Sequence, residues 1–139
     1  MEITAYWEGG YRCRVPIRSF EVRADEPPEA GGTDAGPMPT ELFLASLAVC
    51  FTMAVHHAAR KRGMELPDLA VRVRGDYEGL RFSRLRVEIH SRHSREELEA
   101  ILELAISYCY VSNTLREKPE MDFVVAEEPL THAPLPRHG

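Results

Sequence analysis

The chain has 139 residues, 44% hydrophobic and 28% charged, which is the size and composition of one globular domain. Its 17 basic and 22 acidic side chains give a net charge of −5, which argues against nucleic acid or an anionic membrane surface as the main partner. No apolar run reaches the ~18 residues of a membrane span, and residues 1–7 lack the pattern of a signal peptide. We therefore expect a cytoplasmic protein with no membrane or nucleic-acid partner.

The first 24 residues predict antiparallel strands. Apolar and polar residues alternate over 3–7 and again over 13–17, and Gly9-Gly10 between them is a hairpin turn signal. The second run puts Cys13 on an apolar strand face, where we interpret it as core filler. Residues 25–39 contain four prolines and three glycines, so they predict a loop, long enough to have a functional role.

Residues 40–62 predict a long helix, with Thr40 as its N-cap and Gly63 as its stop signal. From Leu42 to Val55 the helix is apolar almost all round, which is typical of a helix buried on every side. In a domain this small, that pattern predicts a central helix covered in part by another subunit. His57 shares a helix face with Cys50 but lies ~10.5 Å further along the axis, and we interpret it as a pocket-lining or interface residue.

Two strands are predicted over 66–77 and 81–90, because apolar and charged residues alternate on either side of a turn at Gly79. A second helix is expected to open at Ser94, which forms a capping-box pattern with Glu97. Apolar residues then recur at helical spacing and end at Cys109.

Residues 112–114 are polar and offer caps for one more helical turn after Cys109. Residues 121–126 predict a final strand. The segment 127–139 holds three prolines and is expected to be a peripheral tail.

Two cysteines stand in unusual settings: Cys50 lies inside the apolar helix and Cys109 ends an amphipathic one. The residues alone leave three interpretations open, namely buried filler, catalytic nucleophile and redox pair. A thiol in an apolar wall is normally inert, so a reactive Cys50 needs a cation supplied by another segment. The arginine-dense N-terminal strands are the best source, and their alternative role is a solvated face; the candidates are Arg12, Arg14, Arg18 and Arg23.

Two sequence blocks carry a resemblance to a known family. The first is Gly31-Gly32-Thr33-Asp34-Ala35-Gly36-Pro37-Met38-Pro39-Thr40-Glu41-Leu42-Phe43-Leu44-Ala45-Ser46-Leu47-Ala48-Val49-Cys50, and the second is Cys109-Tyr110-Val111-Ser112-Asn113-Thr114-Leu115. Both resemble the OsmC/Ohr family of osmotically inducible and organic hydroperoxide resistance proteins. The order of predicted elements also resembles that of the family, so the similarity covers residues 1 to about 126 within a single domain over 1–139.

The resemblance implies an α+β fold in which antiparallel sheets wrap around long central helices in an intertwined homodimer. It also implies a thiol peroxidase that reduces organic hydroperoxides in oxidative-stress defence. In that role Cys50 is the peroxidatic cysteine, which becomes a sulfenic acid, and Cys109 is the resolving one, which forms a disulfide with it. A dithiol or lipoyl-type reductant then restores both thiols, and no metal or organic cofactor is needed.

The sequence departs from the family pattern at two positions. Thr40 stands where well-characterised peroxidases have a glutamate, and Glu41, one position later, is half a helical turn out of phase with Cys50. Tyr110 replaces the proline after the second cysteine. These departures indicate a less characterised branch, and they keep a second hypothesis open: a dimeric binding or stress-response protein with little peroxidase activity.

Overall fold

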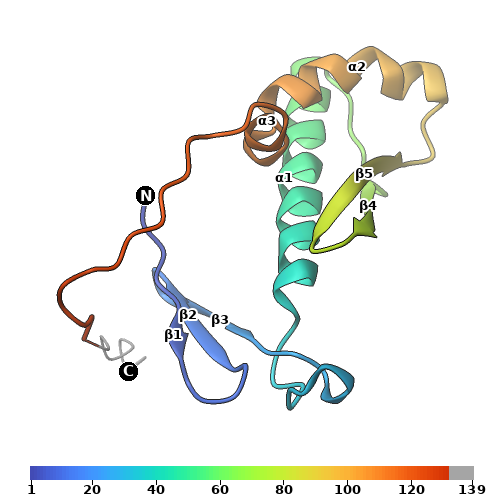
Figure 1. Cartoon of the computed structure of the whole chain (residues 1–139). Helices are drawn as coiled ribbons and strands as arrows, with labels where there is room; N and C mark the ends of the chain where they lie inside the picture. Colours follow the sequence, from blue (N-terminus) through green and yellow to red (C-terminus); the bar gives the residue numbers. More distant parts are fainter. Residues whose placement is uncertain (132–139) are drawn as a thin grey trace. The chain divides into compact units, whose positions relative to one another are not determined.

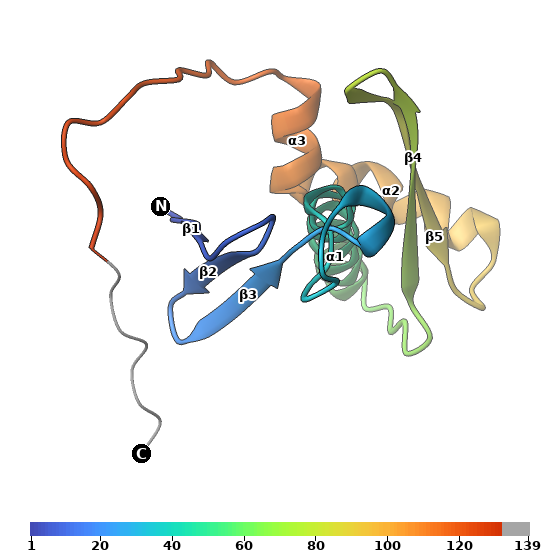
Figure 2. The same ribbon diagram turned by 60° about the horizontal axis from the view of Figure 1, so that its bottom comes forward.

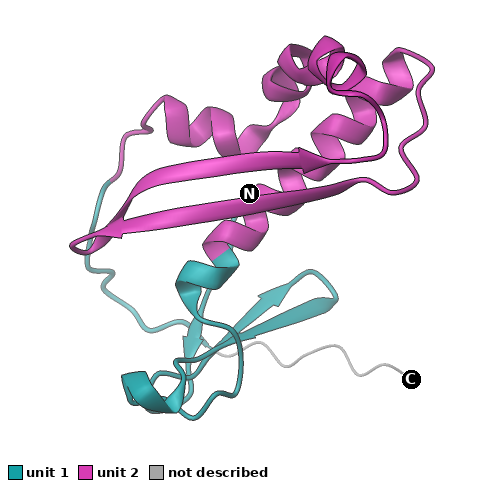
Figure 3. Ribbon diagram, turned by 90° about the vertical axis from the view of Figure 1, so that its right-hand side faces the viewer, with its two compact units in different colours: residues 1–42, 122–139 teal, residues 43–121 magenta. Residues whose placement is uncertain are grey.

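The computed structural model describes residues 1–131 and has the α+β composition that the sequence predicts (Figure 1). In chain order the elements are β1 (Tyr6–Trp7), β2 (Cys13–Ile17), β3 (Phe20–Ala24), the 3-10 turn η1 (Pro28–Ala30), α1 (Pro39–Lys61), β4 (Ala70–Glu78), β5 (Arg81–His90), α2 (Arg95–Tyr108) and α3 (Tyr110–Arg116). They divide into two compact units, which we call the N-terminal unit (1–42 with the segment from 122) and the helical unit (43–121) (Figure 3).

The N-terminal unit is built on an antiparallel sheet in the order β1-β2-β3, which confirms the predicted strands. Gly9 and Gly10 form the turn between β1 and β2 with positive φ angles of 100° and 55°, a conformation that glycine adopts without strain. Cys13 is half-buried and pairs with Trp7 on one side and Ala24 on the other. It therefore lies on the apolar face of the sheet, as predicted.

The helix α1 begins one residue before the predicted N-cap. The Leu42 N–H donates to the Met38 carbonyl (3.0 Å), so the helix opens at Pro39, where a missing N–H has no cost. Met38 is the capping residue, and its own N–H donates to Glu41 Oε1 (2.9 Å). The assignment of Thr40 as N-cap was wrong, because the Glu41 side chain supplies the cap from inside the first turn. The Glu41 carboxylate therefore serves as the cap of α1.

One face of α1 forms the core of the helical unit. The buried side chains on this face are Leu47, Phe51, Ala54, Val55, Ala58 and Ala59, and they pack against Ile101 and Ala105 of α2. The opposite face is open: Val49 is 53% exposed and Met53 is 65% exposed. Burial on every side is therefore not found within residues 43–121 of the helical unit, and coverage of this face by another subunit stays a prediction.

By length and composition, α1 is also apolar enough to cross a membrane, with a mean hydropathy of 1.7 over its best window. The central helix of a globular core has the same property. Its packing against α2 and the β4–β5 hairpin assigns it to the core of the helical unit.

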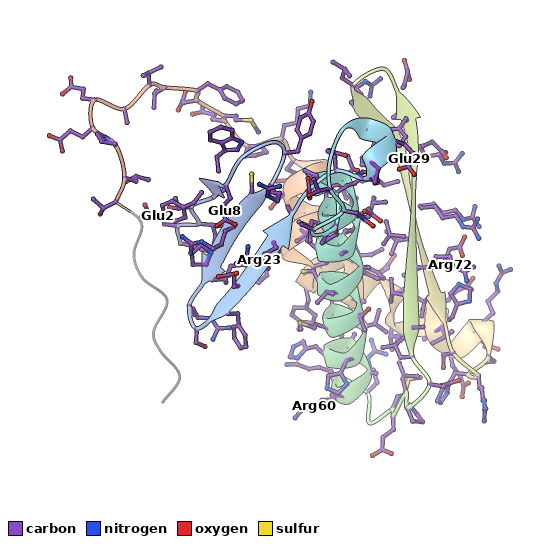
Figure 4. The ribbon with its side chains drawn as sticks, turned by 90° about the horizontal axis from the view of Figure 1, so that it is seen from below. Glu2, Glu8, Arg23, Glu29, Arg60 and Arg72 are labelled. Carbon is purple, nitrogen blue, oxygen red and sulfur yellow. The ribbon has the colours of Figure 1, made fainter. Side chains whose placement is uncertain are left out.

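The β4–β5 hairpin covers α1 and α2 with its apolar face (Figure 2). Val71 and Val73 of β4 pair with Ile89 and Val87 of β5, and all four contact the core cluster. The outer face carries arginines, among them Arg72, which projects away from the helices (Figure 4). This inward-apolar, outward-charged alternation is the one that the sequence predicts.

A β-bulge near the hairpin tip changes the direction of one aromatic side chain. Asp76 pairs with Arg84 but Tyr77 pairs with Phe82, so Ser83 is an extra residue on β5. Because a bulge shifts the alternation by one position, Phe82 leaves the arginine face. Its ring stacks on Tyr77 (4.6 Å between centroids) and on Phe43 of α1 (5.7 Å).

Replacing Gly75 with Ala is expected to displace the Phe82 ring and destabilise the protein by about 1–3 kcal/mol, as overpacking does elsewhere. A Cβ at position 75 would lie 2.6 Å from the Phe82 ring and 3.3 Å from Leu44. Denaturant unfolding measures the loss. The double variant Gly75→Ala/Phe82→Leu should recover part of it, since the two side chains interact directly, and equal stability of Gly75→Ala and the parent chain would contradict the packing described here.

The predicted start of α2 is confirmed. The Ser94 hydroxyl accepts from the Glu97 N–H (3.2 Å), and Glu97 Oε2 accepts from the Ser94 N–H (2.9 Å), which completes the capping box. After α2 the chain forms α3, which is longer than the single turn expected.

Residues 121–126 form no strand within the described chain, contrary to the prediction, and are exposed. An apolar strand sequence needs a sheet edge with which to pair, and no strand among residues 1–131 pairs with this segment. The described part of the predicted tail, 127–131, is exposed, and residues 132–139 lie outside the described range. The single-domain organisation stays a prediction.

Candidate redox site

Cys50 lies in the middle of α1, on the side that meets the core of the helical unit. It is half-buried and packs against the buried cluster that includes Leu47 and Phe51. Its thiol makes no hydrogen bond or ion pair to any of residues 1–131. Cys50 is therefore accessible to a small molecule and is held by apolar contacts alone.

Cys109 is fully buried at the junction of two helices. It ends α2 and is the N-cap residue of α3, with an extended backbone (φ −85°, ψ 100°). Its carbonyl accepts from the Asn113 N–H (3.0 Å) and the Ser112 hydroxyl (3.3 Å). The Asn113 amide also donates to the Ser107 carbonyl (3.2 Å). The polar residues after Cys109 thus close the junction and fix the backbone on which the thiol stands.

The fold brings these two cysteines, 59 positions apart in the sequence, into one hydrophobic cluster. Both are free thiols. Two thiols associated with one cluster, one half-buried and one buried, have the chemistry of an attacking and a resolving thiol. Among the residues the structure describes, no group of three or more His, Cys, Asp or Glu side chains is arranged to hold a metal ion.

The four candidate arginines are all engaged inside the N-terminal unit. Arg14 is buried, pairs with Glu8 (3.7 Å) and lies over the Tyr6 ring. Arg23 pairs with Glu8 (2.9 Å) and also with Glu21 (2.9 Å), and Figure 4 shows Glu8 and Arg23 on the same sheet.

The remaining two make looser local contacts. Arg12 donates to the Glu8 carbonyl (3.3 Å), and Arg18 lies over the Phe20 ring (5.2 Å). Support of Cys50 by one of the four arginines stays a prediction.

The other residues singled out from the sequence have modest roles in one chain. His57 is exposed, and its ring meets Tyr108 edge-on at 4.5 Å between centroids. Tyr110, in place of the family's proline, is 85% exposed at the first position of α3.

Sequence reasoning missed Asp25, which organises the Gly-rich loop before α1. The residue is 1% exposed, and its carboxylate accepts four hydrogen bonds, from the N–H groups of Glu26, Thr33 and Ala35 and from the Thr33 hydroxyl (2.6 Å). Gly32 lies so close to the Glu26 carbonyl that any side chain there would collide with it. A single acidic residue before a Pro-rich loop carries no motif, so only the folded loop reveals its role.

These hydrogen bonds, led by that of the Thr33 hydroxyl, lower the pKa of Asp25 to about 2, although burial acts in the opposite direction. A carboxyl whose pKa is lower in the folded state adds stability above its unfolded pKa, and that contribution disappears as the pH falls through the folded value. The stabilisation by Asp25 is therefore complete above about pH 4 and declines towards pH 2.

Asp25→Asn is expected to lower Tm by about 5 °C or more at neutral pH, because the amide turns one acceptor into a donor facing N–H groups. The difference from the parent chain should shrink between pH 4 and pH 2. Thermal unfolding followed by circular dichroism measures both effects. Asp34→Asn, an exposed residue of the same loop with φ of 56°, is the matched control. Equal losses in the two variants would contradict a special role for Asp25.

Comparison with known proteins settles the family. The family model that describes OsmC-like proteins matches residues 32–124 of this chain, a range that includes both cysteines of the candidate site. The chain belongs to the OsmC-like protein family. The resemblance noted in the sequence is thereby confirmed.

Individual OsmC-like relatives are distant. An uncharacterized protein of Haloferax volcanii is 27% identical over 125 residues, which cover 85% of this chain and 89% of the relative. The organic hydroperoxide resistance protein OsmC of Legionella pneumophila is 26% identical with a TM-score of 0.61, covering 84% of this chain and 90% of the other. That of Elizabethkingia anophelis, solved with thiocyanate bound, is 26% identical with a TM-score of 0.62, covering 85% and 90%.

Proposed function

We propose that this OsmC-like protein is a cysteine-based reductase of organic hydroperoxides that acts in the stress response. The observation that carries the proposal is the presence of Cys50 and Cys109 in one hydrophobic cluster, the first half-buried and the second fully buried. The names of the Legionella and Elizabethkingia structures, both organic hydroperoxide resistance proteins, support the same reaction class.

The reaction balances with the two thiols and one external reductant. The Cys50 thiolate attacks the O–O bond of the hydroperoxide, takes one oxygen as a sulfenic acid and, with a proton, releases the corresponding alcohol. The Cys109 thiol then displaces that oxygen as water and forms the Cys50–Cys109 disulfide. A dithiol of the lipoyl type reduces the disulfide by exchange. No metal or organic cofactor takes part in the proposed cycle, which would operate in the cytoplasm.

The proposed active form is a homodimer. The exposed α1 face with Val49 and Met53, and the exposed apolar residues of 121–125, are surfaces that a second copy can cover. An incoming strand edge would also let 121–126 adopt its predicted conformation. One of the N-terminal arginines would then supply the cation that Cys50 lacks within the helical unit, because arginine stays charged and offers several donors.

One observation favours the second hypothesis, a dimeric binding or stress-response protein with little peroxidase activity. Among residues 43–121 of the helical unit, no side chain forms a hydrogen bond or ion pair with the Cys50 thiol, and Glu41 is used as a helix cap. A thiol in such surroundings reacts slowly.

Mass spectrometry after one equivalent of an alkyl hydroperoxide separates the two hypotheses. The peroxidase proposal requires a Cys50–Cys109 disulfide and one equivalent of alcohol. Unchanged thiols, or a disulfide that involves Cys13, would reject it and leave the binding protein.

A further inference from the structure

We propose that a groove on the helical unit binds a single-chain amphipathic carboxylate. The groove is lined by residues from the start of α1, the tip region of β5 and α3. Phe43, Phe82, Leu85 and Leu115 form its apolar part, and Arg84 and Arg116 are among its polar lining residues. This inference rests on the groove itself and holds whether or not Cys50 reacts with hydroperoxides. We call this site the arginine groove.

The arginine groove has the size of a small-molecule site. Its volume is about 480 Å³, within the range of about 300–1,000 Å³ that ligand pockets usually have. Its apolar part is fixed in place, because the Phe82 ring is stacked between Tyr77 and Phe43. Three elements distant in sequence supply the lining, so the groove is a product of the fold of this unit.

The charge of the groove is uncompensated. No acidic side chain lines it, and neither Arg84 nor Arg116 forms an ion pair with any of residues 1–131. Asp76 stands opposite Arg84 in the hairpin register but makes no ion pair with it. Arg81, also in the lining, is paired with Glu78 (3.4 Å).

Two arginines on the outer face of the same hairpin are neutralised. Arg74 and Arg86, on the outer face, both pair with Glu88 (3.5 and 3.0 Å). Arg84 and Arg116 combine the lack of an acidic partner among residues 1–131 with a place in the lining of the apolar groove, whereas Arg72, which also has none, lies outside it. Guanidinium groups bind carboxylates through paired hydrogen bonds, so an anionic head group completes this site.

The apolar and the charged lining residues of the groove together determine which kind of ligand fits it. An uncharged apolar molecule would cover Arg84 and Arg116 without replacing their solvation, which is unfavourable. A small polar anion would leave Phe43, Phe82, Leu85 and Leu115 in water. A carboxylate with an aliphatic tail satisfies both parts of the groove, and the tail contributes about 0.8 kcal/mol for each buried CH₂.

Isothermal titration calorimetry tests the proposal with decanoate, below the concentration at which it forms micelles, and with decanol and acetate as partial ligands. Decanoate should bind with a stoichiometry of one per chain and at least about tenfold more tightly than either partial ligand. The double variant Arg84→Gln/Arg116→Gln should lose at least that factor for decanoate. Arg72→Gln, an exposed arginine of β4 outside the groove, is the matched control and should bind normally.

Leu115→Ala provides a second readout, because it shortens the apolar wall without touching the charge. It should weaken decanoate more than hexanoate, whose tail reaches less of the groove. Equal affinities for decanoate and decanol, equal losses in the Arg72→Gln and double variants, or no binding at millimolar decanoate would each overturn the proposal. Cys50→Ser should bind decanoate normally, which separates this result from the fate of the peroxidase hypothesis.

Discussion

Cys50→Ser is expected to abolish the reduction of an alkyl hydroperoxide, lowering kcat/KM by at least about 10³-fold. A serine hydroxyl is not ionised at neutral pH and does not attack a peroxide O–O bond. The substitution changes one half-buried atom within an apolar cluster, so the fold should be retained. The measurement is hydroperoxide consumption with dihydrolipoamide as the reductant, with circular dichroism as the check on folding.

Two further cysteine variants make this result specific. Cys109→Ser should consume one equivalent of hydroperoxide and then stall or over-oxidise, because the Cys50 sulfenic acid has no resolving thiol. Cys13→Ser, in the N-terminal sheet, should turn over at the parental rate. If Cys50→Ser retains activity, or if Cys13→Ser loses as much as Cys50→Ser, the proposed mechanism fails.

Met53→Asp is expected to convert the proposed homodimer into monomer and to raise its dissociation constant by at least about 100-fold. Met53 is 65% exposed in one chain on the open face of α1, and burying an unpaired carboxylate there on association costs several kcal/mol. Sedimentation velocity over a range of protein concentrations measures the change. Leu80→Asp, an equivalent substitution at the fully exposed hairpin turn, is the control.

The dimer prediction has a clear contrary outcome. A parent chain that sediments as a folded monomer at micromolar concentration would remove the proposed explanation for the open α1 face. A Met53→Asp chain that still dimerises would place the interface elsewhere.

Elements whose signals are local in sequence were predicted well. The capping box at Ser94 and the hairpin turn at Gly9-Gly10 each depend on a few adjacent residues, and both are found as expected. The start of α1 was misplaced by one residue because Glu41 caps the helix from within its first turn, whereas Thr40 was expected to cap it from its end.

Features that depend on contacts between distant segments could not be predicted from the local sequence. The segment 121–126 has the composition of a strand, but pairing requires an edge that composition does not locate. The importance of Asp25 arises from a loop that returns to it eight to ten residues later. The two candidate cysteines were singled out because a family resemblance, rather than their spacing, relates them, and their roles stay a prediction.

Because Ser83 is an extra residue on β5, the hairpin should be sensitive to insertions and deletions near its tip. Residues next to an exposed turn are usually places where insertions and deletions do little harm. Here, deleting Ser83 would restore strict alternation along β5 and turn Phe82 outward among the arginines. Phe43 would then lose its stacking partner and Gly75 would face an empty space. The tip of this hairpin is therefore expected to tolerate changes of residue type far better than changes of length.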